Sequence, residues 1–335
     1  MGYSRLTNDD LVVSSELVSV PIWSGNRATI PGSELVTGSQ STLSAEFYLD
    51  LYNKTGSGVD VSEVQFAVAY ADADGSGSLN YNNDINGYSR SRTNYGQYRS
   101  LVLGDEETAF YFNEATASAN FWAISIDRAR YKEQLMPGSL ELKLLKTGSK
   151  SDLVLVDGGK VAGSTTRFID SGRVYSLYKQ NTSTQGQQTV ITDKSYGFFL
   201  PDIGVILLDC ALIGDATGRI ADRFAPSTTG KSNQTNAKIL IEAIGYITLR
   251  SAETVSSNYV FVRAKNSEFN YSMNPSNITS TGEIRHSVMI NSPETYITTV
   301  GLYNDNQDLL AVAKLSRPLP KSFSKEALIR IKLNY

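Results

Sequence analysis

Apolar and polar residues alternate along several segments of this chain, most clearly in the last one. In residues 327–335, Ile329, Ile331 and Leu333 fall on one side of an extended backbone, and Arg330 falls on the other. Residues 64–70 alternate in the same way. A period of two is typical of a half-buried β-strand. Both segments are therefore predicted to be strands, and the C-terminal one is predicted to be built into a sheet.

Two pairs of strands are predicted to form hairpins. Residues 140–145 and 152–156 flank a turn at 147–150, and residues 296–303 and 309–315 flank the loop Asn-Asp-Asn-Gln-Asp. Asn and Asp tolerate the left-handed backbone that tight loops need. Further strands are predicted at residues 44–53, 101–103, 109–113, 121–127, 166–178, 197–208, 258–265 and 284–291, with Pro201 interrupting the one at 197–208.

Helix is predicted at one place. Asn236 is a candidate N-cap, Ile239, Leu240 and Ala243 form an apolar stripe, and Gly245 ends the helix. The fold class is therefore predicted to be mainly β, with two or three antiparallel sandwich-like units, one short helix and long loops.

Composition divides the chain into four segments. The first is rich in Ser, Thr and Gly and has no periodic apolar face, so it is predicted to be an extended arm that binds along a neighbouring subunit. The segments are the arm at 1–40, a β domain at 41–157, a middle β-rich region with the helix at 158–250, and a C-terminal β domain at 251–335.

Charge and rare residues exclude several classes of protein. The 335 residues carry 31 basic and 34 acidic side chains, a net charge of −3, without the basic face that nucleic-acid binding needs. One Cys excludes an internal disulfide framework, and one His removes most multi-His metal sites and familiar catalytic triads. No apolar run approaches the ~18 residues of a membrane span, and the N-terminus lacks the apolar region of a signal peptide. We expect the protein to be synthesised in a cytosol and not to insert into a membrane.

Asp72, Asp74 and Ser76 are candidate metal ligands. They occupy positions one, three and five of a calcium-loop pattern, and Gly77 stands at position six. Position twelve is Asn83, where a bidentate Glu is expected, and the flanking segments are predicted strands rather than helices. A solvated turn explains the same residues, so we expect no metal and no other cofactor.

Asp105, Glu106 and Glu107 form a run of carboxylates, with Glu63 and Glu114 as possible partners. A glycosidase needs two carboxyl groups about 5 to 10 Å apart in a cleft. A solvated turn is the alternative interpretation, and we expect no catalytic residue here.

Aromatic residues near these acids have two interpretations. They could form a sugar-binding platform, or they could pack on half-buried strands. They are Tyr95, Tyr98, Tyr111 and Trp122.

Three remaining features are interpreted as non-catalytic. His286 shares one side of a predicted strand with Val288, which favours a hydrogen-bonded sheet histidine. Cys210 follows an apolar run and is predicted to be a small core residue. The Gly-Lys-Ser at 230–232 is not a phosphate loop, because Ala225 stands where that motif requires glycine.

Five segments carry a resemblance to a known family: 95–106, 127–144, 196–208, 257–275 and 294–319. They resemble a virion structural protein of large contractile-tailed phages of the cyanophage type, over most of the chain beyond residue 44. The segment TVGLYNDNQDLLAVAK is also similar to a hairpin of tail-fibre and baseplate proteins. The resemblance implies a tail component, at the baseplate or its periphery, that assembles with other tail proteins and with copies of itself. It implies location in the virion after synthesis in the host cytoplasm, and no catalytic residue.

Three hypotheses of function follow. A tail or baseplate assembly protein predicts large buried interfaces and no cleft. A receptor- or glycan-binding module predicts an exposed aromatic groove. A cell-wall glycosidase predicts paired acids in a pocket. The first is preferred, and no enzymatic activity is expected.

Overall fold

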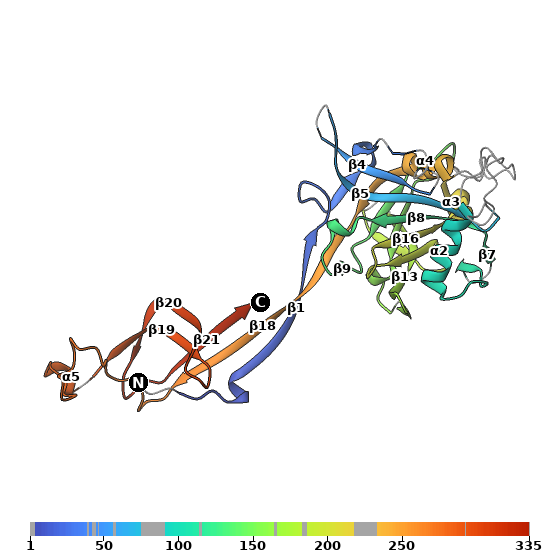
Figure 1. The fold of residues 1–335 in the computed structure, drawn as a ribbon. Coiled ribbons are helices and arrows are strands. Elements are labelled where there is room, and N and C mark those ends of the chain that lie inside the picture. Colours follow the sequence, from blue (N-terminus) through green and yellow to red (C-terminus); the bar gives the residue numbers. More distant parts are fainter. Residues whose placement is uncertain are drawn as a thin grey trace. The chain divides into compact units, whose positions relative to one another are not determined.

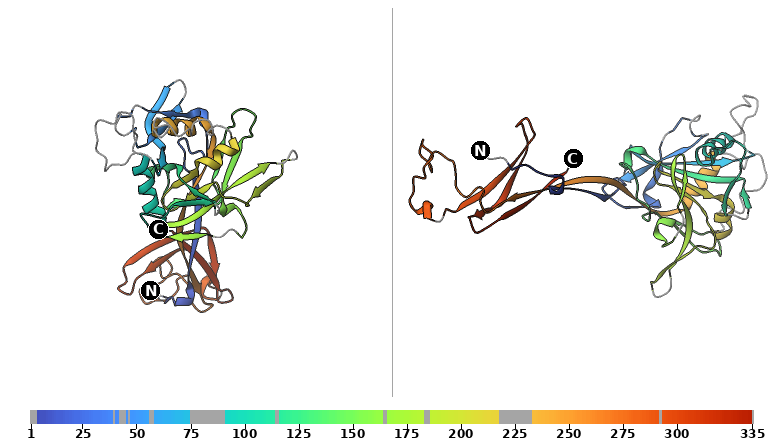
Figure 2. Two further views of the ribbon diagram at one scale, coloured as in Figure 1. Left: turned by 90° about the vertical axis from the view of Figure 1, so that its right-hand side faces the viewer. Right: turned by 90° about the horizontal axis from the view of Figure 1, so that it is seen from below.

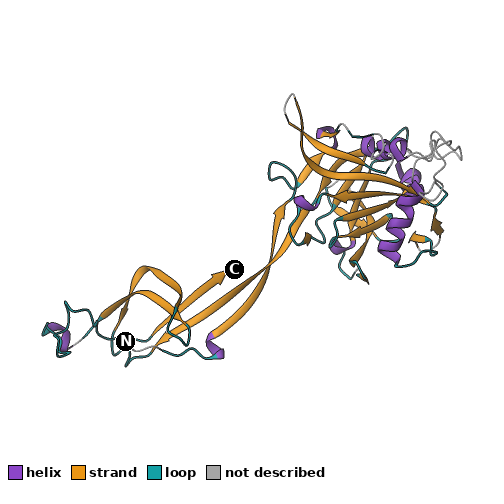
Figure 3. Cartoon of the chain, in the orientation of Figure 1, coloured by secondary structure: helices purple, strands orange, loops and turns teal. Residues whose placement is uncertain are grey.

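The computed structural model describes residues 4–38, 40–41, 45, 47–55, 58–74, 91–113, 116–163, 166–182, 186–217, 233–291 and 293–334. Most of the described elements are β-strands (Figure 1; Figure 3), which confirms the predicted mainly-β fold class. The chain divides into two compact units. We call Val18–Glu253 the large unit, and Met1–Leu17 together with Thr254–Tyr335 the terminal unit.

A thirteen-stranded sheet forms the large unit, and every strand pair described in it is antiparallel. Eleven strands follow one path, and β12 and β14 each pair with β13 beside it. The order along the path is β2 (Thr29–Pro31), β17 (Ile244–Thr248), β10 (Glu141–Leu144), β11 (Leu153–Asp157), β13 (Gly172–Thr182), β15 (Gly197–Leu200), β16 (Val205–Asp209), β8 (Asn120–Ile126), β5 (Gly58–Asp72), β4 (Leu49–Thr55) and β3 (Leu35–Thr37), with β12 at Arg167–Ile169 and β14 at Gln188–Ile191.

Alternate residues of the central strands enter two separate hydrophobic cores. In β16, Ile206 and Leu208 belong to one core, while Val205 and Leu207 belong to the other. The strands β5 and β8 divide in the same way. Successive side chains of a strand point to opposite faces, so a strand buried on both faces is apolar throughout. This explains why β16 begins with the unbroken run Val-Ile-Leu-Leu.

Helices contribute side chains to both cores of the large unit. The helix α2 (Ser91–Leu103) contributes to the second core, and α3 (Cys210–Thr217) and α4 (Asn233–Ala243) contribute to the first. The helix predicted near residue 236 is confirmed as α4. The expectation of one short helix was wrong, because α2, α3 and the four-residue α5 (Val288–Asn291) are also present.

The terminal unit has a small sheet and a hairpin. The sheet order is β1 (Leu11–Pro21), β18 (Arg250–Ala264) and β21 (Ala327–Asn334), and the hairpin is β19 (Thr295–Tyr303) with β20 (Leu309–Lys321). Residues 11–17 of β1 and 254–264 of β18 lie in this unit. Two further views in Figure 2 show these blue, orange and red strands gathered together. The predicted terminal strand and hairpin are both confirmed.

The units do not follow the four segments predicted from composition. The sheet of the large unit continues across the predicted boundary at 157/158, because β11 pairs with β13. Part of the predicted arm also belongs to the large unit, where Ile22, Trp23 and Ile30 are buried in its first core. Short strands and 3-10 turns complete the described elements: β6 (Phe110–Asn113), β7 (Thr116–Ser118), β9 (Gln134–Leu135), η1 (Asn8–Asp10), η2 (Gly32–Glu34), η3 (Arg128–Arg130) and η4 (Gly158–Lys160).

Candidate functional site

Exposed apolar side chains are concentrated in the terminal unit. Among the described residues of the large unit, the exposed large hydrophobic side chains are Val18, Tyr48, Leu101, Tyr111 and Phe168. The smaller terminal unit has many more: Leu6, Leu11, Val12, Val13, Leu17, Phe269, Tyr271, Met273, Val288, Ile290, Tyr296, Tyr303, Leu309, Leu310, Val312, Phe323 and Leu328.

The terminal unit also lacks a hydrophobic core of its own among the residues that the structure describes. Its buried hydrophobic residues are Val260, Ala264, Ala327 and Ile331, and neither core cluster contains any of them. Single exposed apolar residues are ordinary, but an exposed set of this extent is typical of a surface that another molecule covers.

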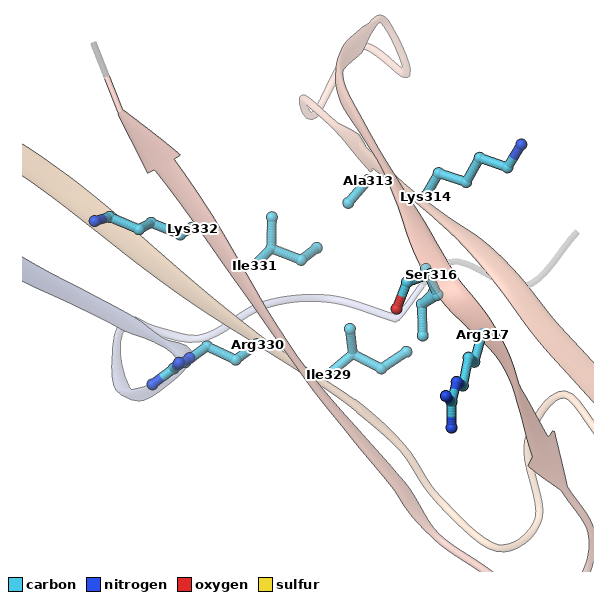
Figure 4. A pocket seen from close by; sticks show the side chains of 9 residues that line it. Ala313, Lys314, Ser316, Arg317, Ile329, Arg330, Ile331 and Lys332 are labelled. Carbon is cyan, nitrogen blue, oxygen red and sulfur yellow. The ribbon is translucent and has the colours of Figure 1, made fainter.

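A groove runs between β20 and β21 within this unit. Its volume is about 370 Å³. Figure 4 shows Ile329 and Ile331 projecting from β21 toward β20, and Ala313 projecting back toward β21. The facing layers therefore leave aliphatic side chains only partly packed. The full lining is Ala313, Lys314, Leu315, Ser316, Arg317, Ile329, Arg330, Ile331 and Lys332, which contains four cations and no carboxylate.

The outer face of β21 is basic and partly apolar. Leu328 is 66% exposed on this face. The Arg330 guanidinium lies 5.4 Å from the ring centre of Tyr259, and the Lys332 ammonium lies 5.8 Å from it. Cations over an aromatic face at this distance are attracted by its quadrupole. In the described part of the chain, neither cation forms an ion pair.

A buried lysine fixes the end of the hairpin. Lys321 is fully buried, and its ammonium donates to the Asn266 carbonyl oxygen at 3.2 Å, to Asn270 Oδ1 at 2.7 Å and to the Ser322 carbonyl oxygen at 3.0 Å. Three acceptors match the three donors of an ammonium group. Because all of its donors are engaged within the chain, Lys321 is a structural clamp.

The candidate metal ligands have local partners. Asp72 is 3% exposed at the end of β5, where its Oδ2 accepts from the Tyr70 hydroxyl at 2.8 Å and its Oδ1 accepts from the Asp74 amide at 2.9 Å. Burial, together with the charges of Cys210 and Asp72, raises the pKa of Tyr70. Ser76 lies outside the described residues. Within them, no three His, Cys, Asp or Glu residues are placed to hold a metal ion.

The candidate catalytic carboxylates have separate partners. Asp105 accepts from the Glu107 amide at 2.8 Å and from the Thr108 hydroxyl. Both hydrogen bonds lower the pKa of Asp105, and the bond from the Thr108 hydroxyl has the larger effect. Glu63 instead pairs with the Arg130 guanidinium at 3.0 Å. Glu106 and Glu107 are exposed, and Glu114 lies outside the described residues.

The proposed aromatic platform is largely a packing cluster. Tyr95 is 4% exposed and Trp122 fully buried, and the Trp122 indole donates to the Asn236 carbonyl oxygen at 2.9 Å. Tyr98 packs against the second core, whereas Tyr111 is 51% exposed. Burial raises the pKa of Tyr98 to about 12.

The predictions for the single cysteine and the single histidine had different outcomes. Cys210 is fully buried in the first core, as predicted, and burial raises the pKa of its thiol. The prediction for His286 was wrong: it is exposed in the loop before α5, and its carbonyl oxygen accepts from the Met289 amide at 2.9 Å. The Gly-Lys-Ser at 230–232 lies outside the described residues.

No known family model matches this chain, and neither the curated proteins nor the solved structures contain a significant match. The helices in the described ranges include none that is both long and apolar enough to cross a membrane.

The main feature that sequence reasoning missed is β1. Its segment Leu-Val-Val-Ser-Ser-Glu-Leu is exposed on both faces. A signal for this strand was present in the sequence, because Leu11, Val12 and Val13 form a short apolar run that places apolar side chains on both sides of an extended backbone.

Proposed function

We propose that this protein is a structural component that assembles into a larger particle through its terminal unit. The observation that carries this proposal is the set of exposed apolar side chains on a unit with few buried ones. Burying apolar surface contributes about 25 cal/mol per Å², so covering this unit would strongly stabilise an assembly. The resemblance to virion proteins of contractile-tailed phages favours a tail, at the baseplate or its periphery, as that particle.

The other hypotheses gain less support from the residues described. Asp105 and Glu63 are engaged in separate local contacts, and Tyr95 and Trp122 are buried. We therefore propose binding to protein partners, and no catalytic role.

The test compares exposed apolar side chains of the two units. Leu310 and Val312 are 67% and 59% exposed on β20, and Phe168 is 75% exposed on β12. Leu310→Ser with Val312→Ser is expected to lower incorporation into particles at least ~10-fold, a loss of about 1.4 kcal/mol in association. The melting temperature of the isolated protein should stay unchanged, since both side chains face solvent.

Phe168→Ser is the matched control, and it should be incorporated normally. Normal incorporation of the Leu310→Ser, Val312→Ser variant would refute assembly through this hairpin. A density map of the particle would then show which surface, if any, makes the contact.

A further inference from the structure

The sheet of the terminal unit has two strand edges without a described partner. The strand β18 lies between β1 and β21 in this sheet. The strand β21 pairs with β18 along eight residues, Ala327 to Asn334, and β20 belongs to a separate two-stranded sheet. An unpaired edge presents backbone N–H and C=O groups that can extend the sheet into another chain.

Over residues 11–17, the edge strand β1 has little of the usual protection against such pairing. Natural edges are blunted by charged side chains, proline or bulges, and these residues contain one charge, Glu16, and neither lysine nor proline. Leu11, Val12, Val13 and Leu17 are 46%, 49%, 65% and 51% exposed. An edge strand that is apolar on both faces is suited to lie between two layers of another subunit.

The two edges carry opposite charge. Asp9 and Asp10 precede β1 and Glu16 lies within it, and no cation occurs between Arg5 and Arg27. On β21 the charged side chains are Arg330 and Lys332. Pairing β1 with β1, or β21 with β21, would bring like charges together, which is unfavourable. Pairing β1 with β21 brings opposite charges together.

We propose that β1 of one copy of this chain adds along the free edge of β21 of the next copy. Leu11, Val13 and Leu17 share one face of β1 and enter the groove between β20 and β21, whose apolar lining includes Leu315, Ile329 and Ile331. Glu16 then faces the basic rim of that groove. This inference rests on the proposed assembly function and names its partner, a second copy.

The contact is heterologous, because it joins two different edges of the same sheet. Each copy offers one β1 edge and one β21 edge, so repetition closes into a ring when the rotation between copies permits it. A closed ring leaves no free edge, which is how barrels avoid open-ended aggregation. We therefore take the closed ring as the proposed state in solution, because an open filament would leave one unprotected edge at each end.

The first test measures mass and edge pairing in the full-length chain. Light scattering should give a multiple of the 36.6 kDa chain mass. Val12 lies on the same face of β1 as Glu16, and Leu328 lies on the same face of β21 as Arg330. Val12→Cys and Leu328→Cys chains, made with different tags in one host, should therefore form mixed cross-linked dimers. Either variant made alone should form far fewer, and Leu328→Cys made with Phe168→Cys is the matched control. The native Cys210 thiol is buried.

Three results would overturn the proposal. They are a monomer at micromolar concentration, equal cross-linking in either variant alone, and an oligomer without mixed cross-links.

The second test reverses charge. Glu16→Lys should weaken association about 10-fold, because a lysine would then face the cations of β21. Glu16→Lys combined with Arg330→Glu in the same chain should restore it. A double variant no stronger than the single one would contradict the pairing of these edges.

The two proposals fail in different ways. A monomer whose incorporation into particles still requires Leu310 and Val312 would retain the assembly function and overturn the ring. A ring with β1–β21 cross-links that never enters particles would support the ring and refute the proposed function.

Discussion

At the scale of single residues, Asp157 ties together two segments of the large unit. Its Oδ1 accepts from the amides of Gly138 at 2.7 Å and Gly159 at 2.8 Å, and its Oδ2 accepts from the Leu140 amide at 3.0 Å. The side chain is fully buried. Burial raises the pKa of Asp157, while the three hydrogen bonds act in the opposite direction. Close approach requires glycine at 159, where a Cβ would lie 2.6 Å from the Gly138 nitrogen.

Asp157→Asn is expected to lower the free energy of unfolding by about 1–3 kcal/mol. An amide group accepts through one oxygen only and would turn an N–H donor toward a backbone amide. Urea denaturation measures the loss. Asp170→Asn is the control, because Asp170 is exposed, and it should change stability by less than about 0.5 kcal/mol. A wild-type stability for Asp157→Asn would show that the three amides find other acceptors.

Arg173 and Asp202 form an ion pair in the large unit that is joined by several hydrogen bonds. The Asp202 carboxylate accepts from the Arg173 amide at 2.7 Å and from its guanidinium, which also donates to Gln134. Burial alone would raise the pKa of Asp202, but the hydrogen bonds and charge of Arg173 outweigh it and lower that pKa. Gly172, at φ +118°, leaves room for the Asp202 side chain.

The lowered pKa fixes the sign of a pH dependence. Because the carboxyl binds its proton less readily in the folded state, the pair stabilises the protein above the unfolded-state pKa of about 3.9. That contribution is lost as the pH falls through the lower folded-state pKa. Asp202→Asn should cost about 1 kcal/mol at pH 7, a modest value because solvent reaches both side chains. Its stability should converge on that of the wild type in acid, and a difference that persists at pH 2 would contradict the role of ionisation.

Local chemistry around Asp72 was predictable from the sequence, but its environment was not. The Asp-Ala-Asp pattern correctly indicated turn chemistry, since the Asp72 carboxylate accepts from the Asp74 amide. Its contact with Tyr70 depends on burial, which neighbouring residues in the sequence do not encode. The prediction for His286 was wrong for the same reason. The alternation around it predicted a half-buried strand, yet His286 is exposed and Val288 is 83% exposed.

At the scale of elements, hairpins were predicted well and α2 was missed. The pairs β10–β11 and β19–β20 are set by their own turn residues and alternation. The helix α2 contains Gly96 and Asn94, which have low helix propensity. Tertiary contacts stabilise it instead. Tyr95 packs in the second core, and the Asn94 amide donates to the carbonyl oxygens of Phe47 and Tyr70.

The two faces of β21 predict different effects of substitution. Ile331 is 6% exposed, and the strand pairs with β18 at Val260. Ile331→Ala should cost about 2 kcal/mol, the lower end of the range for a core aliphatic residue, because the groove already leaves its packing incomplete. Arg330→Ala should change stability by about 0.5 kcal/mol or less, while weakening association between copies. Thermal melts of dilute protein and light scattering measure the two effects. Equal melting temperatures for both variants would mean that the inner face of β21 is not packed.

At the scale of the whole molecule, the division into units could not be predicted from composition. The terminal unit combines the two ends of the chain, and pairing between such distant segments has no local signal. The large unit depends equally on long-range pairs, because β17 joins β2 and β10 at one end of the strand order. Alternation and turn residues determine which strands form, whereas the order of strands depends on how two cores are filled simultaneously.

This division predicts that the large unit folds alone and the terminal unit does not. Both hydrophobic cores lie within residues 22–249, so the fragment Val18–Glu253 should unfold cooperatively and stay monomeric. The full chain should associate, because the exposed side chains of β1 and the hairpin are then present.

Limited proteolysis of dilute full-length protein should remove residues before Ile22 first and should stop there, since Ile22 and Trp23 are buried. Heat denaturation, light scattering and the masses of the cleavage products measure these three outcomes. A fragment that aggregates or melts without cooperativity would mean that the large unit needs the terminal strands to complete its fold. An N-terminus that resists digestion in dilute protein would mean that pairing with β18 alone is enough to protect β1.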